Sequence, residues 1–200
     1  MVPIVYIHGK YAGCNHAVAK ELCKLIPNSK LIDDSLNVGP AKAAARSAEE
    51  YWSFRTALRR RNLRSIYSEE SASETTWIIV DQDYSQESKS FLAADYEFAA
   101  VSSHSPVISI IINYDLELSC KKAREDAKDS VANNAKADEL EKIRDRCNKE
   151  QVFRFRNDYE LEFEVTLMSP TMAAETVRAH IQTVKRRLEK KEKHAWIRAY

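Results

Sequence analysis

The feature that most constrains the fold is an apolar strand that leads straight into a glycine-containing loop and a helix. Residues 2–7, VPIVYI, are β-rich and nearly all apolar, which is typical of a strand buried on both faces of a parallel sheet. A helical pattern follows at 17–26, and the loop before it holds Gly9 and Gly13, two of only three glycines in the chain. Glycine suits backbone with positive φ or a close approach, so we expect a tight strand-to-helix turn here.

The alternation of strands and helices continues along the chain. Further strands are predicted at 30–32, 76–80 and 106–112, and residues 152–155 and 161–165 together supply a final strand region. Further helices are predicted at 47–66, 91–101 and 171–187, with Ser169 as the cap of the last one and a break at Gly39 and Pro40. This order predicts an α/β fold in which a parallel five-stranded sheet is flanked by helices in a three-layer sandwich. Right-handed crossovers would place Gly9, Asp33, Asp81 and Asp115 along one edge of it.

Length and composition favour one domain. We predict a single domain over 1–184, with a charged helical lid at approximately 119–149 as a mobile cover over the site, and a charged helical tail at 185–200. The net charge of +1 gives no overall attraction to nucleic acid or acidic membrane, and no apolar run suits a membrane helix. Four dispersed cysteines without a CxxC pair, and no visible secretory signal, indicate a reducing, cytoplasmic location and no structural zinc.

The loop at 9–16, GKYAGCNH, follows the outline of the phosphate-binding motif GxxxxGK[ST]. Gly9 is its first position, whereas Cys14, Asn15 and His16 stand where the motif has Gly, Lys and Ser/Thr. Backbone N–H groups at a helix start can still bind an anion, but asparagine brings no positive charge and histidine is a poor ligand for Mg²⁺. We therefore predict a degenerate phosphate-binding loop and no protein metal site. Its predicted ligand-binding residues are Gly9, Lys10, Gly13, Cys14, Asn15 and His16.

Three compensations for the missing lysine stay open. Lys10 can supply the charge from the second loop position, or a basic residue from 119–149 can swing in. Alternatively the loop hosts different chemistry, since a thiol at a helix start is a candidate for a lowered pKa. Cys14 would then act with His8 or His16 as its base. A plainer interpretation of Cys14 is a small residue tolerated in a turn.

Over residues 2–182 the chain resembles the P-loop nucleoside-kinase-like superfamily, in particular small AAA-type and chloramphenicol-phosphotransferase-like kinases. The segments that carry this resemblance come in the order VYIHGKYAGCNHAVAKEL, KLIDD, EEYWSFRTALRRRNLRSI, WIIVDQDYS, PVISIIINYD, ELEKIRD with QVFRF, and LEFEVTLMSPTMAAETVRAHI. The resemblance implies ATP as cofactor, with Mg²⁺, and a small-molecule phosphate acceptor as substrate.

The resemblance also implies roles for single residues. The acidic residue that binds or activates the acceptor maps onto Asp33 or Asp34, and an arginine facing the acceptor maps onto Arg55. Asp81 maps onto the carboxylate that orients Mg²⁺ through water. Lid residues that would clamp phosphates are Lys121, Lys122, Arg124, Arg144 and Arg146.

Each of these residues also has a structural interpretation. An aspartate after a buried strand is as commonly a turn former or a helix cap as a ligand. The arginines at 59–61 and 64 are typical of a solvated helix face, and no aromatic residues interleave them as a nucleic-acid surface would require, so we expect no nucleic-acid partner. Fold alone does not decide function.

Three functions are therefore carried forward. The first is an ATP-dependent phosphotransferase acting on a small molecule or nucleotide, with Asp33, Arg55 and Asp81 as its catalytic residues. The second is a catalytically inactive kinase-like module that binds a ligand or partner. The third is an enzyme that reuses the phosphate pocket for non-phosphoryl chemistry through Cys14 or His16.

Overall fold

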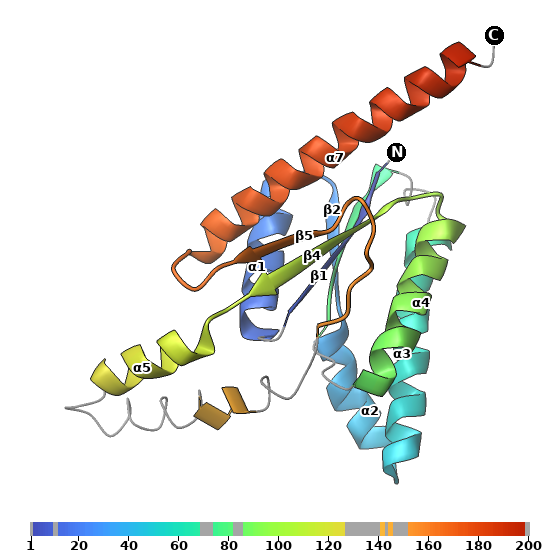
Figure 1. The fold of residues 1–200 in the computed structure, drawn as a ribbon. Helices are drawn as coiled ribbons and strands as arrows, with labels where there is room; N and C mark the ends of the chain where they lie inside the picture. Colours follow the sequence, from blue (N-terminus) through green and yellow to red (C-terminus); the bar gives the residue numbers. More distant parts are fainter. Residues whose placement is uncertain are drawn as a thin grey trace.

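A computed structural model describes residues 2–9, 12–68, 74–81, 86–126, 141–142, 144–145 and 152–198 of the chain. Its five strands are all parallel and lie in the order β2-β3-β1-β4-β5, as predicted for a three-layer α/β fold (Figure 1). The strands are β1 (Ile4–Gly9), β2 (Ser29–Asp33), β3 (Thr76–Val80), β4 (Val107–Asn113) and β5 (Leu161–Glu164). The helices are α1 (Ala12–Leu25), the 3₁₀ helix η1 (Asp34–Asn37), α2 (Val38–Ala44), α3 (Ala48–Ser68), α4 (Gln86–Ser102), α5 (Leu116–Asp126) and α7 (Pro170–Arg198).

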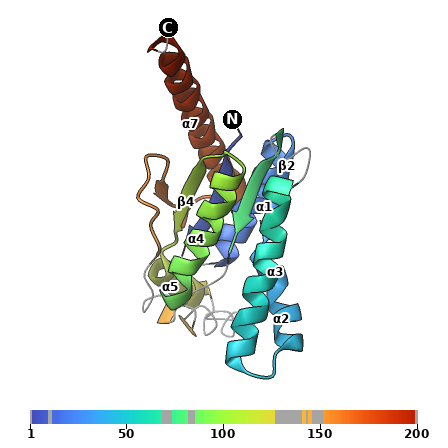
Figure 2. The ribbon, with the colours of Figure 1, turned by 90° about the vertical axis from the view of Figure 1, so that its right-hand side faces the viewer.

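The central strand β1 is apolar on both sides because each side of the sheet is covered. Side chains alternate along a strand, so Val5 and Ile7 join one buried cluster and Ile4 and Tyr6 join the other. The first cluster takes its helical residues from α1 and α7, and the second takes them from α3 and α4. Figures 1 and 2 show these two helical layers on opposite faces of the sheet.

Gly9 has a different role from the one predicted. No described glycine has positive φ, so a left-handed turn is not what Gly9 supplies. A Cβ at this position would lie 2.1 Å from the backbone oxygen of Ile112 on β4, to which β1 is paired. Glycine is needed because two backbones approach closely inside the sheet.

Two other predictions were wrong in detail. Residues 152–155 do not form a strand, and Phe155 instead packs against the second cluster beside Tyr6, with ring centroids 5.8 Å apart. Gly39 and Pro40 do not break the chain but lie in the first turn of α2, where proline is tolerated because that N–H has no helical partner.

The last helix begins directly after its predicted cap, Ser169, and runs on into 185–200, where a charged helical tail is predicted. The Oγ of Ser169 accepts a hydrogen bond from the backbone N–H of Met172 at 3.2 Å, which satisfies one donor of the first turn of α7. The helix then continues to Arg198 and projects past the sheet (Figure 1). Among the described helices, none combines the length and apolar character needed to cross a bilayer.

Candidate functional site

Acidic and polar residues gather where the parallel strands end. The carboxyl ends of parallel strands share one edge of a sheet, and in α/β folds ligands bind at that edge. Asp33 closes β2, Asp34 follows it, and Asp81 comes directly after β3. Gly9 closes β1 between β3 and β4, and α1 begins at Ala12. The edge therefore brings several candidate residues together.

Asp34 and Asp81 share one buried arginine. The Nε and Nη2 of Arg55 donate to Asp34 Oδ2 at 3.1 and 2.7 Å, and Nη2 also donates to Asp81 Oδ1 at 3.3 Å. Tyr96 Oη donates to Asp81 Oδ2 at 2.8 Å, and Asn37 Nδ2 donates to Asp34 Oδ1 at 2.9 Å. All five residues are buried. We call this set, Asp34, Asn37, Arg55, Asp81 and Tyr96, the Arg55 cluster.

The Tyr96 phenol is fixed as a neutral donor. Burial raises the pKa of Tyr96 well above its ordinary value of 10.0, and the nearby Asp81 carboxylate raises it further. The hydroxyl therefore keeps its proton at neutral pH and donates a hydrogen bond to Asp81. Tyr96 could not be predicted as part of the site, because nothing in the sequence marks the tyrosine of α4 as the partner of an aspartate 15 residues earlier.

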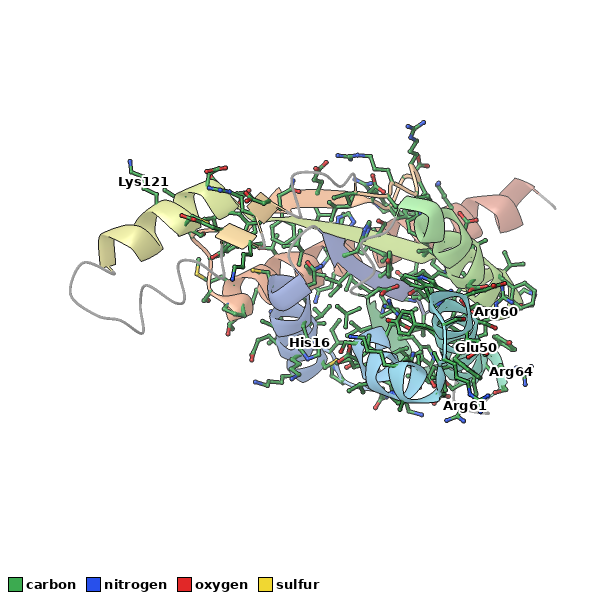
Figure 3. The ribbon with its side chains drawn as sticks, turned by 90° about the horizontal axis from the view of Figure 1, so that it is seen from below. His16, Glu50, Arg60, Arg61, Arg64 and Lys121 are labelled. Atoms are coloured by element: carbon green, nitrogen blue, oxygen red, sulfur yellow. The ribbon has the colours of Figure 1, made fainter. Side chains whose placement is uncertain are left out.

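Asp33 lies on the other side of β2 from the Arg55 cluster. Its Oδ1 accepts from the backbone N–H of Ser35 at 3.0 Å and from the Ser35 hydroxyl, so Asp33 caps η1. Its Oδ2 lies 3.2 Å from Nδ1 of His16, a residue of α1 (Figure 3). The structure thus brings Asp33 together with His16, and Arg55 together with Asp34 and Asp81, in two separate sets.

Asn15, at the lysine position of the motif, is turned inward. It is 0% exposed, and its Nδ2 donates to the backbone oxygen of Gly9 at 3.3 Å. Its Oδ1 is buried and makes no hydrogen bond within the part of the chain that the structure describes. Gly13 is exposed in the first turn of α1. Lys10 lies outside the described residues.

A cavity of about 250 Å³ lies against the start of α1. Its wall combines the beginnings of α1 and α7 with the ends of β4 and β5, and most of it is apolar. The lining residues are Gly13, Cys14, Ala17, Val18, Tyr114, Val165, Met168, Ser169, Pro170 and Ala173.

Cys14 lines this cavity as a neutral thiol. Burial raises the pKa of Cys14 from 9.0 to about 12, with a smaller contribution from the carboxylate of Glu164. This direction is opposite to the lowered pKa that nucleophilic chemistry at Cys14 would need. The finding weakens the hypothesis that the loop hosts thiol chemistry.

The raised pKa predicts slow alkylation of Cys14. At pH 8 we expect iodoacetamide to modify Cys14 in the folded protein at least about tenfold more slowly than in the urea-unfolded chain, because only the thiolate reacts. The rate should rise as the pH approaches 12, where the thiolate forms. Peptide mapping by mass spectrometry measures the rate at Cys14 itself. Equal rates in the folded and unfolded chain would contradict the buried, neutral thiol.

The basic residues of α3 divide into two groups. Arg59 is buried and donates from Nη2 to Asp95 Oδ2 at 3.0 Å, and the exposed Arg60 donates from Nε to Asp95 Oδ1 at 2.8 Å, which ties α3 to α4. Arg61 and Arg64 are exposed on the outer side of α3 (Figure 3). The run of arginines is therefore partly an internal set of ion pairs and partly a solvated face.

Only part of the predicted lid can be placed. Lys121 is exposed on α5 (Figure 3), and Arg124 lies on the same helix, although its side chain is outside the described part. Arg144 pairs with Asp145 at 2.9 Å and with Glu117 at 3.5 Å. Arg146 lies outside the described residues, and so does the side chain of Lys122. The prediction that these residues clamp phosphates stays a prediction.

His8 was considered only as a base for Cys14, but it faces a different partner. Its Nε2 lies 3.0 Å from Ser109 Oγ, and its ring stacks on Tyr6 with centroids 4.5 Å apart. Phe155 packs edge-on against both rings. Because His8 and Tyr6 point to the same side of β1, they belong to the face that α3 and α4 cover.

Comparison with known proteins identifies the fold. No protein-family model and no curated protein matches the sequence. Among solved structures, the tunicamycin resistance protein of Deinococcus radiodurans is 13% identical, covers 90% of this chain and 96% of its own, and has a TM-score of 0.57. A gluconokinase from Sinorhizobium meliloti 1021 is 6% identical and has a TM-score of 0.57. The match covers 94% of this chain and 97% of the gluconokinase. A sugar kinase from Janibacter sp. HTCC2649 is 10% identical and has a TM-score of 0.53. The match covers 91% of this chain and 95% of the sugar kinase.

These neighbours confirm the predicted class of fold. The chain shares its three-layer α/β fold with the tunicamycin resistance protein, the gluconokinase and the sugar kinase, and the likeness runs over nearly the whole chain. At these identities the likeness concerns the fold, and the chemistry has to be argued from the residues.

Proposed function

We propose that the protein is an ATP-dependent phosphotransferase that acts on a hydroxyl group of a small molecule. The observation that carries the proposal is the buried Arg55 cluster at the carboxyl edge of the sheet. Two carboxylates held by one guanidinium and one phenol are costly to bury, and such perturbed sets occur often at functional sites. The kinases among the structural neighbours support the same reaction class. An ATP-dependent activity fits a cytoplasmic location.

The described residues fit a nucleotide at two points. The cavity beside Cys14 and Met168 is apolar and has room for a planar base, and the N-terminus of α1 favours an anion such as a phosphate group. ATP would supply the phosphoryl group. The fit to Mg²⁺ is poor, because His16 replaces a hydroxyl and both oxygens of Asp81 already accept hydrogen bonds. We assign no described residue to the metal.

The carboxylates of the Arg55 cluster would act on the acceptor. Asp34 shares the face of Asp81, and a carboxylate there can accept the proton of an attacking hydroxyl. Arg55 donates hydrogen bonds to both carboxylates and so holds them close to each other. Asp33, which caps η1 and lies beside His16, is left to position the edge of the sheet and α1.

A second candidate function, a kinase-like binding module without turnover, rests on Asn15. The side chain donates back to Gly9 and brings no positive charge to the start of α1. Phosphoryl transfer relies on neutralising developing charge, so the protein can bind a ligand without transferring phosphate.

Calorimetric titration of ATP into the native protein, with and without Mg²⁺, tests the first function. We expect micromolar binding, and an at least tenfold loss of affinity in Met168→Trp, because the indole fills the cavity. The matched control is Leu167→Trp, which places the same indole at an exposed neighbour that does not line the cavity. No binding at millimolar ATP, or equal loss in both variants, would contradict the proposed nucleotide site.

The same titration on Asn15→Lys shows whether the missing lysine matters. If only Asn15→Lys binds ATP, the native protein lacks the phosphate site and phosphotransfer is contradicted. If the native protein binds ATP as well as the variant does, the missing lysine is compensated, and formation of ADP then separates phosphotransfer from binding without turnover.

A further inference from the structure

The cavity beside α1 has a buried floor and opens to solvent. Its buried lining residues are Val18, Val165 and Ala173, and its exposed ones are Gly13, Ser169 and Pro170. Apolar side chains therefore meet the faces of a flat group that enters the cavity, whereas an edge of that group stays at the mouth, in contact with water.

The side chains of the wall carry little hydrogen-bonding chemistry. Of the described residues that line the cavity, none has a charged or an amide side chain, which are the groups that read base edges in nucleic acids. What the wall offers is the hydroxyls of Tyr114 and Ser169 and the neutral thiol of Cys14. Ser169 is exposed, and its Oγ accepts from the backbone N–H of Met172 at 3.2 Å. The buried part of the wall is therefore apolar.

The backbone of the wall is largely paired within the protein. The N–H of Val165 donates to the oxygen of Asn113 at 2.9 Å, and the N–H of Met168 donates to the oxygen of Val165 at 2.9 Å. The N–H of Ala173 donates to the oxygen of Ser169 at 3.0 Å. In α1 the carbonyl groups accept from N–H groups four residues further on. These groups are engaged in the fold and are not directed at a ligand.

A carboxylate could favour guanine by accepting from its ring N–H and its amine, and Glu164 is the carboxylate that acts on Cys14 through its charge. Glu164 is exposed and is not one of the residues that line the cavity. Its Oε1 accepts from the backbone N–H of Thr166 at 2.9 Å. The carboxylate is thus tied to its own loop, outside the cavity wall.

We propose that the cavity binds a purine base by its shape and its apolar faces, and that it does not distinguish adenine from guanine. The two bases share the same fused rings and differ in the groups on their edges, for which the buried wall has no matching partner. A pyrimidine has a single ring and buries less apolar surface. The inference rests on the proposed function, because it assigns the cavity to the base of the phosphoryl donor, which is then either purine nucleoside triphosphate.

Ligand-observed NMR with nucleosides on the native protein tests this preference. Nucleosides carry no phosphate, so they report on the cavity alone. The probes are adenosine, inosine, guanosine, cytidine and uridine. We expect the dissociation constants of the three purine nucleosides to agree within about threefold, and the two pyrimidine nucleosides to bind at least about fivefold more weakly. A larger spread among the purines, pyrimidines that bind as tightly as purines, or no binding by any purine nucleoside overturns the proposal.

The variant Met168→Gln links the preference to the cavity wall. It replaces a thioether by an amide of similar length, and a glutamine amide can donate to and accept from adenine but not guanine in a paired arrangement. The affinity for adenosine relative to guanosine should therefore rise at least about threefold. Leu167→Gln is the matched control, because Leu167 is an exposed neighbour outside the lining, and its ratio should stay that of the native protein. An unchanged ratio in Met168→Gln, or the same change in both variants, overturns the proposal.

The two proposals fail separately. A protein that binds the purine nucleosides alike and binds no ATP would contradict phosphotransfer and leave the base preference standing. A protein that binds ATP but separates adenosine from guanosine by more than about threefold would do the reverse.

Discussion

Replacing Arg55 by methionine is expected to lower the free energy of unfolding by about 3–5 kcal/mol, because it removes the guanidinium that pairs with two buried carboxylates. Asp34 and Asp81 would then face each other as like charges, and the methionine can fill part of the space but donates no hydrogen bond. Urea denaturation at pH 7 measures the change. This is a large fraction of the stability of an ordinary domain.

Two further variants make the Arg55 result specific. Arg61→Met removes the same charge from an exposed position on α3 and should leave the unfolding midpoint unchanged within error. The double variant Arg55→Met/Asp34→Asn should recover part of the loss, because one of the two uncompensated charges is gone. Equal losses in Arg55→Met and Arg61→Met, or no recovery in the double variant, would show that the ion pairs do not hold the site together.

Gly9→Ala is expected to destabilise the protein strongly. The added Cβ would lie 2.1 Å from the Ile112 oxygen, a backbone atom of the neighbouring strand, so β1 and β4 would have to separate at the centre of the sheet. We expect a loss of about 3 kcal/mol or more in the free energy of unfolding, at the upper end of overpacking effects. Thermal and urea denaturation measure it.

Gly39→Ala is the matched control for Gly9→Ala. Gly39 lies in α2, and a Cβ there would meet no heavy atom within 4 Å. Alanine in a helix is favoured over glycine by about 0.5–1 kcal/mol, so this variant should be as stable as the native protein or more so. If both alanines destabilise alike, the close approach of β1 to β4 is not the reason for glycine at position 9.

The sheet could be predicted because its strands are continuous apolar runs. The bounds predicted for β3 match the structure, and β1 and β4 were displaced by one or two residues at their ends. Residues 152–155 misled the prediction because alternating apolar residues look the same in a strand and in a loop that rests on the core. Phe155 packs against Tyr6, and of the two segments only Leu161–Glu164 pairs with β4.

The candidate site could be predicted only in part. Asp33 and Asp34 are consecutive, so they leave β2 on opposite sides, and the sequence cannot say which of them meets Arg55. The contacts of Asp34 with Arg55 and of Asp81 with Tyr96 join elements far apart in the chain. The pKa of Cys14 is raised because the thiol is buried against the cluster that α7 helps to form. The position of Cys14 at the start of a helix does not reveal this burial.

The cavity beside α1 joins the two ends of the chain. Cys14 and Ala17 come from the first helix, whereas Ser169, Pro170 and Ala173 come from the start of the last one. A molecule that binds there touches segments about 150 residues apart, so its binding stabilises the folded arrangement of both. Such a ligand is expected to raise the free energy of unfolding by RT ln(1 + [L]/Kd) and with it the midpoint temperature, so a thermal-shift screen can find it without any assay of turnover.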